Sequence, residues 1–367
     1  MKRRYFELDL MRDYVLLLLP FVHVFEDAEL WLFATKELSQ SYSWIVYNCI
    51  YGASVFMVIM GMNIAFSGKT GTEDFFRRGV YLLVASYILN IFRFLVPAVV
   101  AYLFSGTPDW MGIDLAIICC IAPDIMTFAG FAFLTLAFLT YLKFSKTKML
   151  VVALVLMVIN DLLANVEYHC PEIVQVALGS FVWTNGYSFF PLFAWFMFPV
   201  YGYFLADYVM EIPSEKLRAF WRKIAFISTV IMVLMWGVIS YLGMDFWKVA
   251  IPPFNDYVTS SMTVVIDICA TNMVIYLGYE LYYWLNLQRF NNYIRGFSVN
   301  INAYYMVHWL IVGSWQFYRL GAGRYNVADV GITFFWVTSV TTCVVSIILA
   351  PYFRKYILLP AEKYVVG

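Results

Sequence analysis

Long apolar segments separated by short polar connections run through the whole chain. A membrane-spanning helix needs about 20 mainly apolar residues, and by that measure we predict about ten such helices. Their expected ranges are 10–29, 44–66, 79–104, 122–142, 149–163, 187–209, 224–243, 259–285, 298–318 and 328–350. The pattern predicts an all-α polytopic membrane protein, formed by a single integral-membrane domain over residues 1–367 with no separate soluble domain.

The distribution of Lys and Arg gives an expected orientation. With about ten helices, most of these residues fall before the first helix, in the connections after alternate helices, or in the C-terminal tail. The connections on the other side hold only Lys36, Lys248, Arg319 and Arg324. Because cytoplasmic connections carry an excess of Lys and Arg, we expect both termini in the cytoplasm.

Four connections on the opposite side are longer and mix aromatic with polar residues. They are expected at 26–43, 105–121, 164–186 and 244–258. Trp, Tyr, Asp and Asn in such loops suit binding of a sugar or a lipid headgroup. A belt of aromatic residues at the membrane interface explains the same composition equally well, so both interpretations stay open.

Composition strengthens the membrane assignment and adds little about partners. Hydrophobic residues make up 63% of the 367 residues and charged residues 13%, about half of the charged fraction of an average soluble domain. Lys plus Arg and Asp plus Glu both number 24, so net charge gives no sign of nucleic-acid binding. We find no glycine-rich nucleotide motif and no zinc-type spacing, and therefore expect no bound metal.

The first predicted helix carries the most unusual residues of the chain. Arg12 lies at its polar start and His23 in its apolar interior. Eleven residues correspond to about three helical turns, so both side chains share one face, roughly 16 Å apart along the axis. A neutral imidazole can take a proton from a hydroxyl, which makes His23 a candidate general base; a structural hydrogen bond between helices is the alternative.

Three arginines on the expected cytoplasmic side are candidates for binding a phosphate or pyrophosphate. The guanidinium of Arg12 has the right fork, although Asp9, three residues earlier, is a competing partner. Arg77 and Arg78 follow the second helix and could extend an anionic site. A snorkelling interfacial position for Arg12, and the excess of positive charge on that side for the other two, are the alternatives.

Further polar residues lie inside predicted spans. Arg93 must be paired or face water, and Asp124 in the next helix is a plausible partner, in a structural ion pair or at a functional site. His308 shares a helical face with Tyr304. We assign Asp9, Arg93, Asp124 and His308 supporting roles around His23.

Several of these segments together resemble a superfamily of membrane acyltransferases. The opening Arg4-Tyr-Phe-Glu-Leu-Asp9-Leu-Met-Arg12 followed by His23 is similar to the charged start and intramembrane histidine of the acyltransferase-3 family. Residues 55–66, 124–134, 190–208 and 303–311 resemble later helices of the superfamily, including its heparan-glucosaminide acetyltransferase-like branch. Asp13 stands where the family has glycine, and Arg77 and Arg78 are adjacent rather than spaced.

The resemblance implies an O-acetyltransferase-like enzyme in a membrane, with the bacterial inner (cell) membrane expected. An acyl group, expected to be acetyl, would pass from cytoplasmic acyl-CoA to a hydroxyl or amine of an extracytoplasmic carbohydrate or glycolipid. His23 would be catalytic, and Arg12, Arg77 and Arg78 would bind CoA. Membrane lipids are the other expected partners, and a homodimer stays open.

Two other functions use the same residues. A transporter or flippase for a lipid-linked sugar or small anion would use the intramembrane charges as a substrate path, although no internal repeat is visible. A non-enzymatic membrane partner or sensor would use His23 and Arg93 structurally. Stabilisation by CoA separates the transferase from both alternatives. Direct transfer and an acyl-histidine intermediate both stay open.

Overall fold

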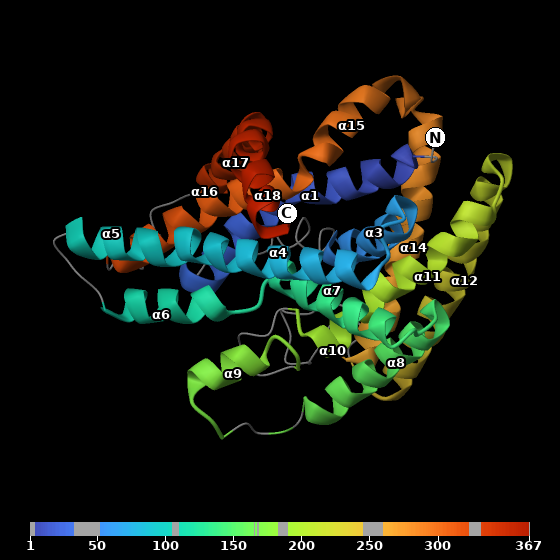
Figure 1. The fold of residues 1–367 in the computed structure, drawn as a ribbon, viewed down its shortest axis with the longest axis horizontal. Helices are drawn as coiled ribbons and strands as arrows, with labels where there is room; N and C mark the ends of the chain where they lie inside the picture. Colours follow the sequence, from blue (N-terminus) through green and yellow to red (C-terminus); the bar gives the residue numbers. More distant parts are fainter. Residues whose placement is uncertain are drawn as a thin grey trace. The chain divides into compact units, whose positions relative to one another are not determined.

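The computed structural model describes residues 4–32, 52–104, 110–164, 166, 169–182, 190–244, 260–322 and 332–366, and every regular element in these residues is a helix. The helices, shown in Figure 1, are α1 (Phe6–Leu32), α3 (Gly52–Ser67), α4 (Thr72–Asn90), η1 (Ile91–Leu95), α5 (Val96–Phe104), α6 (Trp110–Ile121), α7 (Ile125–Tyr141), α8 (Lys146–Leu163), α9 (Glu172–Leu178), α10 (Leu192–Trp195), α11 (Met197–Glu211), α12 (Ser214–Tyr241), α14 (Ser261–Trp284), η2 (Leu287–Phe290), α15 (Asn291–Val299), α16 (Ile301–Gly321), α17 (Ile332–Phe353), η3 (Arg354–Leu358) and α18 (Leu359–Val366).

The all-helical membrane architecture is confirmed. Each of the ten predicted ranges overlaps a helix, and six helical runs in the described residues are long and apolar enough to cross a membrane. These runs are Thr72–Phe104, Gly112–Tyr141, Leu192–Glu211, Ser214–Tyr241, Ser261–Trp284 and Trp336–Glu362. The count of ten spans and the side of each terminus stay predictions.

One predicted connection is wrong over most of its length. Residues 105–121 were expected to form a loop, but α6 occupies Trp110–Ile121. The segment is apolar apart from Asp114, and only its shortness hid it from a criterion of about 20 residues. Two shorter helices, α9 and α15, also lie in stretches where the sequence predicts connections. Residues 245–258 of the last outer connection lie outside the described residues.

The prolines of α1, α10 and α11 lie where the helices tolerate a missing backbone N–H or begin. Pro191 precedes α10, and Pro199 lies in the first turn of α11, where a missing backbone N–H costs nothing. The described part of the predicted helix over 187–209 is one helical run, Leu192–Glu211, with a break at Phe196 between α10 and α11. Pro20 lies within α1, and the helix continues through it to Leu32.

The chain divides into two compact units in which distant parts of the sequence alternate. Unit 1 comprises Met1–Arg12, Ile50–Leu83 and Pro123–Arg295, and unit 2 comprises Asp13–Cys49, Val84–Ala122 and Gly296–Gly367. Helices α1, α4 and α15 each contribute residues to both units.

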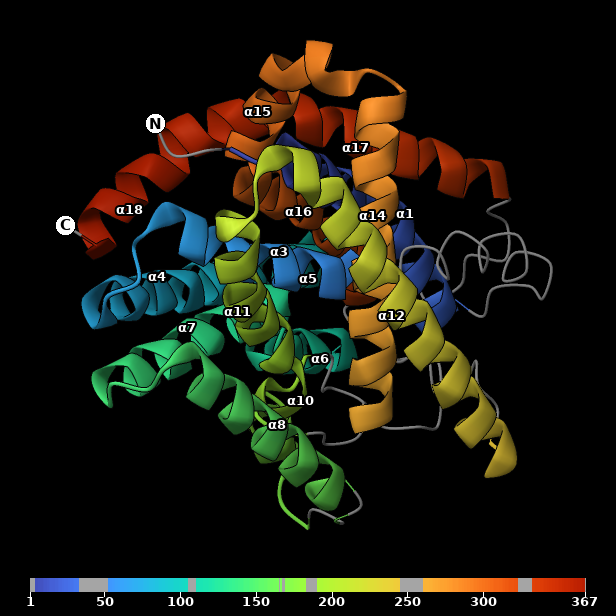
Figure 2. The same cartoon turned by 90° about the vertical axis from the view of Figure 1, so that its right-hand side faces the viewer.

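Close contact between α3 and α11 organises unit 1, and the two helices lie side by side in Figures 1 and 2. A Cβ atom on Gly61 would lie 2.0 Å from the backbone oxygen of Pro199, and one on Gly202 would lie 2.0 Å from that of Val58. Small residues let helix backbones approach in a membrane, where apolar side chains gain little from each other. Gly61 and Gly202 thus allow the backbones of α3 and α11 to pack closely.

A π-helical turn shapes the part of unit 2 that faces α16. Pro97 lacks the N–H that would bond the carbonyl of Arg93, and the turn η1 accommodates this, with the N–H of Val96 bonded to the oxygen of Ile91. A Cβ on Gly313 of α16 would lie 3.1 Å from Cβ of Arg93. The missing side chain therefore lets α16 approach the π turn closely.

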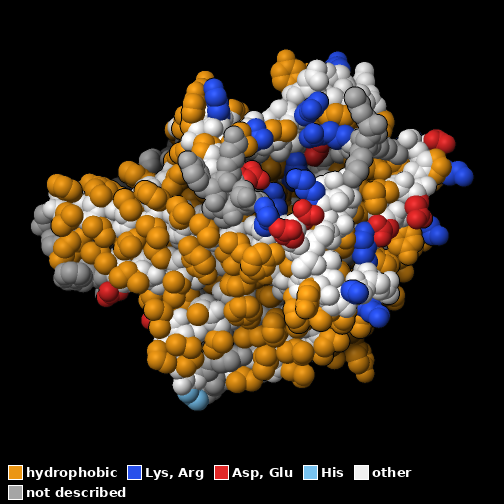
Figure 3. Space-filling view, in the orientation of Figure 1, with side chains coloured by type: hydrophobic (Ala, Val, Ile, Leu, Met, Phe, Trp, Pro, Cys, Tyr) orange, Lys and Arg blue, Asp and Glu red, His pale blue; other side chains and the backbone are white. Residues whose placement is uncertain are grey.

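The outer surface is apolar along the helices that cover it. Hydrophobic side chains form an almost continuous layer over α4 and α5 on the face shown in Figure 3. Phe92 of η1 and Leu103 and Phe104 of α5 are among the exposed large hydrophobic side chains. In water such an apolar surface would favour aggregation, but it is suited to contact with the hydrocarbon of a bilayer, as expected for an integral membrane protein.

Candidate functional site

His23 contacts two neighbouring residues of α16 within unit 2. Its ring centroid lies 3.9 Å from that of Trp309 and 5.5 Å from that of His308, with the two imidazoles within 14° of parallel. His23 is partly buried and His308 is fully buried. The structure therefore brings together two of the predicted site residues, which lie far apart in the sequence, and adds Trp309 of α16 as a second contact of His23.

The hydrogen bond of His308 favours one tautomer. Its Nδ1 lies 3.3 Å from the carbonyl oxygen of Tyr304, one turn earlier in α16. A carbonyl oxygen can only accept, so Nδ1 carries the proton and Nε2 is left as an acceptor. Tyr304 and Tyr305 also place their rings 5.9 Å and 5.3 Å from His308. The aromatic surroundings fix the imidazole and keep water away from it.

Arg93 stacks on the same tryptophan. Its guanidinium carbon lies 4.3 Å from the ring centroid of Trp309 and 4.3 Å from that of Phe94. A cation over an aromatic face is attracted by the ring quadrupole, and more so where water is excluded. Arg93 is 3% exposed, so this arrangement contributes to holding a charge inside the protein. Trp309 thus has His23 and Arg93 as neighbours within unit 2.

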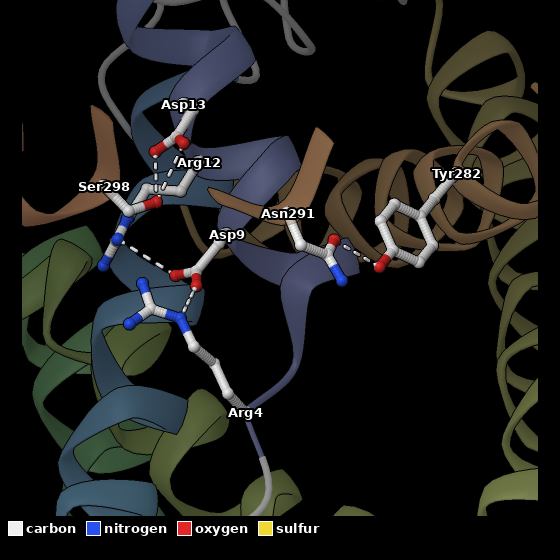
Figure 4. A network of polar contacts seen from close by, with 7 residues as sticks. All are labelled: Arg4, Asp9, Arg12, Asp13, Tyr282, Asn291 and Ser298. Atoms are coloured by element: carbon white, nitrogen blue, oxygen red, sulfur yellow. Dashed lines mark hydrogen bonds and ion pairs between the residues drawn. The ribbon is translucent and has the colours of Figure 1, made fainter. Parts of the chain in front are cut away.

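Asp13, which stands where the resembling family has glycine, accepts a hydrogen bond from Ser298. The serine Oγ lies 2.8 Å from each carboxylate oxygen of Asp13, and both residues are buried in unit 2 (Figure 4). Asp13 lies ten residues before His23 on α1. The carboxylate therefore ties α1 to α15, the helix that leads into α16.

Asp9 joins two arginines at the start of α1, in unit 1. Its Oδ2 accepts from Nε of Arg4 at 2.6 Å, and its Oδ1 accepts from Nη2 of Arg12 at 3.1 Å (Figure 4). The competing partner expected for Arg12 is thus present. Arg12 is largely buried, with 14% of its side chain exposed, so it is not a freely snorkelling residue. A second pair in Figure 4, Tyr282 and Asn291, joins α14 to α15 in unit 1.

The two adjacent arginines after α3 are exposed on α4. Arg77 donates from Nη2 to Glu73 at 2.6 Å, a helical i to i+4 pair that is open to solvent. The Arg78 guanidinium carbon lies 5.9 Å from the ring centroid of Phe133, in α7. Both side chains are accessible to a soluble ligand, although neither position by itself indicates a phosphate.

Asp124 caps α7. Its Oδ1 accepts from the backbone N–H of Thr127 at 2.8 Å and from the Thr127 hydroxyl at 3.0 Å. A carboxylate at this position satisfies a free donor and complements the helix dipole. Asp124 belongs to unit 1 and Arg93 to unit 2. The pairing suggested for these two residues accordingly stays a prediction.

The sequence missed Trp309 and the partnership of the two histidines. A His-Trp pair in a late apolar helix was visible, but no spacing rule connects that helix to α1. The side chains of Glu26 and Asp27, three and four residues after His23 on α1, lie outside the described residues. No group of three or more His, Cys, Asp or Glu suited to a metal ion occurs in the part of the chain that the structure describes.

Comparison with known families bears on the first two thirds of the chain. The model of the family described as "Heparan-alpha-glucosaminide N-acetyltransferase, catalytic" matches residues 4–245, a range that contains Arg12, His23 and Arg93 and ends before α16. No curated protein and no solved structure matches the chain. The likeness to the acyltransferase-3 family stays a prediction, whereas the likeness to the heparan-glucosaminide acetyltransferase-like branch of the superfamily is confirmed. The chain belongs to the family of the heparan-alpha-glucosaminide N-acetyltransferase catalytic domain.

Proposed function

We propose that this chain is a membrane-embedded acetyltransferase that moves an acetyl group from cytoplasmic acetyl-CoA to an extracytoplasmic carbohydrate or glycolipid. The accepting group is a hydroxyl or an amine. Membership of an acetyltransferase family supports the reaction class, and the long apolar helices support its place in a cell membrane. The observation that carries the proposal is His23, a histidine of an apolar helix, held against His308 and Trp309.

His23 acts as the general base. A neutral imidazole removes the proton from the attacking hydroxyl or amine as its oxygen or nitrogen bonds to the acyl carbon. The carbon–sulfur bond then breaks, and the sulfur leaves with the bonding electron pair. The imidazolium returns the proton to the CoA thiolate, so the histidine ends unchanged. Contact with the Trp309 ring supports this role because it restricts the orientation of the imidazole.

Arg12, Arg77 and Arg78 bind the phosphates of CoA in this proposal. Guanidinium groups make bidentate, charge-assisted hydrogen bonds to phosphate oxygens. Arg12 and Arg4 share one carboxylate, Asp9, which orients the Arg12 fork. Arg77 is exposed and paired with Glu73, and a surface ion pair of this kind is weak. Arg77 would therefore give up its contact with Glu73 to bind a phosphate.

Replacement of His23 tests the reaction. In liposomes, transfer of labelled acetyl from acetyl-CoA to glucosamine, a probe with one amine and several hydroxyls, should fall by at least about 100-fold in His23→Ala. His169→Ala is the matched control, because His169 is exposed in a connection, and it should keep wild-type transfer. Full transfer in His23→Ala would reject His23 as the base.

Binding of the donor separates the transferase from its rivals. Acetyl-CoA should raise the thermal unfolding temperature of wild type and of His23→Ala alike, because the base is not needed for binding. A transporter of a lipid-linked sugar or a non-enzymatic sensor has no reason to respond to CoA. Absence of any stabilisation, together with absence of CoA release, would overturn the proposed function itself.

A further inference from the structure

Two buried polar atoms beside His23 lack partners in the described part of the chain. These atoms are the indole Nε1 of Trp309 and the imidazole Nε2 of His308. They belong to neighbouring residues of α16, and both rings contact or approach the ring of His23 within unit 2. One is a donor, since an indole nitrogen only donates, and the other is an acceptor, since Nδ1 of His308 carries the proton.

Such atoms are costly in a folded protein. Most buried polar atoms have a partner, and each exception calls for a reason. Leaving a donor or acceptor buried and unmatched costs about 1–3 kcal/mol. A donor and an acceptor without partners, on rings whose centroids lie 5.6 Å apart beside a candidate base, form the pattern of a site whose ligand supplies the complementary groups.

We propose that Trp309 and His308 complete the site around His23. The indole N–H of Trp309 donates to the carbonyl oxygen of the acyl thioester, and His308 Nε2 accepts a second polar hydrogen of the acceptor molecule. This inference rests on the proposed acetyl transfer. It adds a residue that stabilises the transition state and a residue that orients the acceptor.

The donor acts where charge develops. As the acceptor nitrogen or oxygen bonds to the acyl carbon, the carbonyl electron pair moves onto the oxygen, and the proton passes to His23. The oxygen then carries a negative charge, and a fixed N–H directed at it is worth more than in water. When the carbonyl reforms, the sulfur leaves with its electrons and takes the proton back from His23, so atoms and charge balance.

The fold holds Trp309 in place before any ligand binds. Arg93 lies over its ring at 4.3 Å, and His23 packs against it at 3.9 Å. Gly313, one turn further along α16, lets the π turn that carries Arg93 come close. A donor fixed by packing needs no reorganisation during the reaction, which is the condition for effective electrostatic catalysis.

Removal of the N–H alone tests the role of Trp309. In Trp309→Phe the aromatic ring stays and the donor is lost. We expect kcat for acetyl transfer to glucosamine to fall by about 100-fold or more, with an unchanged KM for acetyl-CoA and an unfolding temperature at or above that of the wild type. Trp315→Phe is the matched control, because Trp315 is exposed on the same helix, and it should behave as wild type.

A second variant keeps the test decisive if Trp309→Phe folds poorly. Trp309→His restores a ring N–H, and we expect it to transfer faster than Trp309→Phe at equal folded protein. A kcat within twofold of wild type in Trp309→Phe, or no advantage of Trp309→His, would overturn the role of Trp309. An inactive His23→Ala beside a fully active Trp309→Phe rejects this inference alone, whereas a fully active His23→Ala rejects the proposed function.

The role of His308 is tested by substitution with Gln and with Asn, whose side chains differ in length. Gln can place an acceptor oxygen near the position of Nε2, whereas Asn reaches only the position of Nδ1. We therefore expect His308→Asn to raise the KM for glucosamine about tenfold, the loss of one hydrogen bond, and His308→Gln to stay near wild type. Equal KM values in both variants and the wild type would overturn the role of His308.

Discussion

The Ser298 hydroxyl lies at 2.8 Å from both carboxylate oxygens of Asp13. One hydroxyl has one hydrogen, so the proton is shared between the two oxygens or alternates between them. The contact explains why an acidic residue is tolerated where the resembling family has glycine. A buried carboxylate needs a donor, and α15 supplies it.

Loss of this donor should destabilise the protein. We expect Ser298→Ala to lower the free energy of unfolding by about 1.5–3 kcal/mol, because a buried charged acceptor loses a hydrogen bond. Ser298→Thr keeps the hydroxyl and should lose much less. Thermal unfolding in detergent or lipid nanodiscs measures both variants. Equal stability of Ser298→Ala and wild type would show that Asp13 is satisfied without the serine.

Substitution of Gly61 or Gly202 should disrupt unit 1. Each added Cβ would meet a backbone oxygen at 2.0 Å, which a side-chain rotation cannot relieve. Either change to alanine should therefore cost about 1–3 kcal/mol or more. Gly237 in α12 is the matched control, since a Cβ there meets nothing within 4 Å. Gly237→Ala should leave the unfolding temperature unchanged or slightly higher. Indifference to Gly61→Ala would mean that α3 and α11 separate easily.

Neutralisation of Arg12 should weaken donor binding. Arg12→Gln removes a charge-assisted hydrogen bond to a phosphate, and we expect the Kd for acetyl-CoA to rise about tenfold or more. Arg218→Gln is the control, because Arg218 is paired with Glu280 at 2.6 Å in the part of unit 1 formed by α12 and α14. Calorimetric titration with acetyl-CoA measures both. If the two variants bind as tightly as wild type, Arg12 has no part in the donor site.

Asp161 should anchor the start of α14. Its Oδ1 accepts from the backbone N–H of Ser261 at 3.0 Å, and its Oδ2 accepts from the Ser261 hydroxyl. Asp161→Ala leaves a helix-start donor without its carboxylate, and we expect a loss of about 1–2 kcal/mol in stability. Asp161→Asn keeps an acceptor and should lose less. Hydrogen exchange at the first turn of α14 reports the change locally, and unchanged exchange would contradict this role.

Pattern alone predicted most helices because each depends on local composition. The helix through Arg93, residues 79–104, is a good example, although the π turn around Arg93 was not predicted. That turn fits Pro97, whose missing N–H was visible in the sequence, but the close approach of Gly313 to the turn is a tertiary contact that the sequence pattern does not show. Helix α6 was missed because twelve residues fall below a length criterion made for whole spans.

Individual site residues could be predicted because an ionisable side chain inside a membrane helix costs free energy. A histidine or arginine within an apolar run is expensive and therefore conspicuous, which singled out His23, Arg93 and His308. Their neighbours were not predictable, since Trp309 is an ordinary residue of an apolar helix. Asp9 was correctly expected to compete for Arg12, because the two residues are one helical turn apart.

The hydrophobic pattern alone predicts a chain of apolar helices in a membrane, with a histidine inside the first. The length of each apolar run is sufficient for this prediction, because each segment is buried in hydrocarbon separately. The contacts of His23 with Trp309 and His308, and of Asp13 with Ser298, are known only from the folded structure. Contact between apolar side chains of two helices gives little free energy in lipid. Close packing at small residues, aromatic contacts and single hydrogen bonds therefore determine which helices pair. Those contacts join distant segments, and no local pattern encodes them.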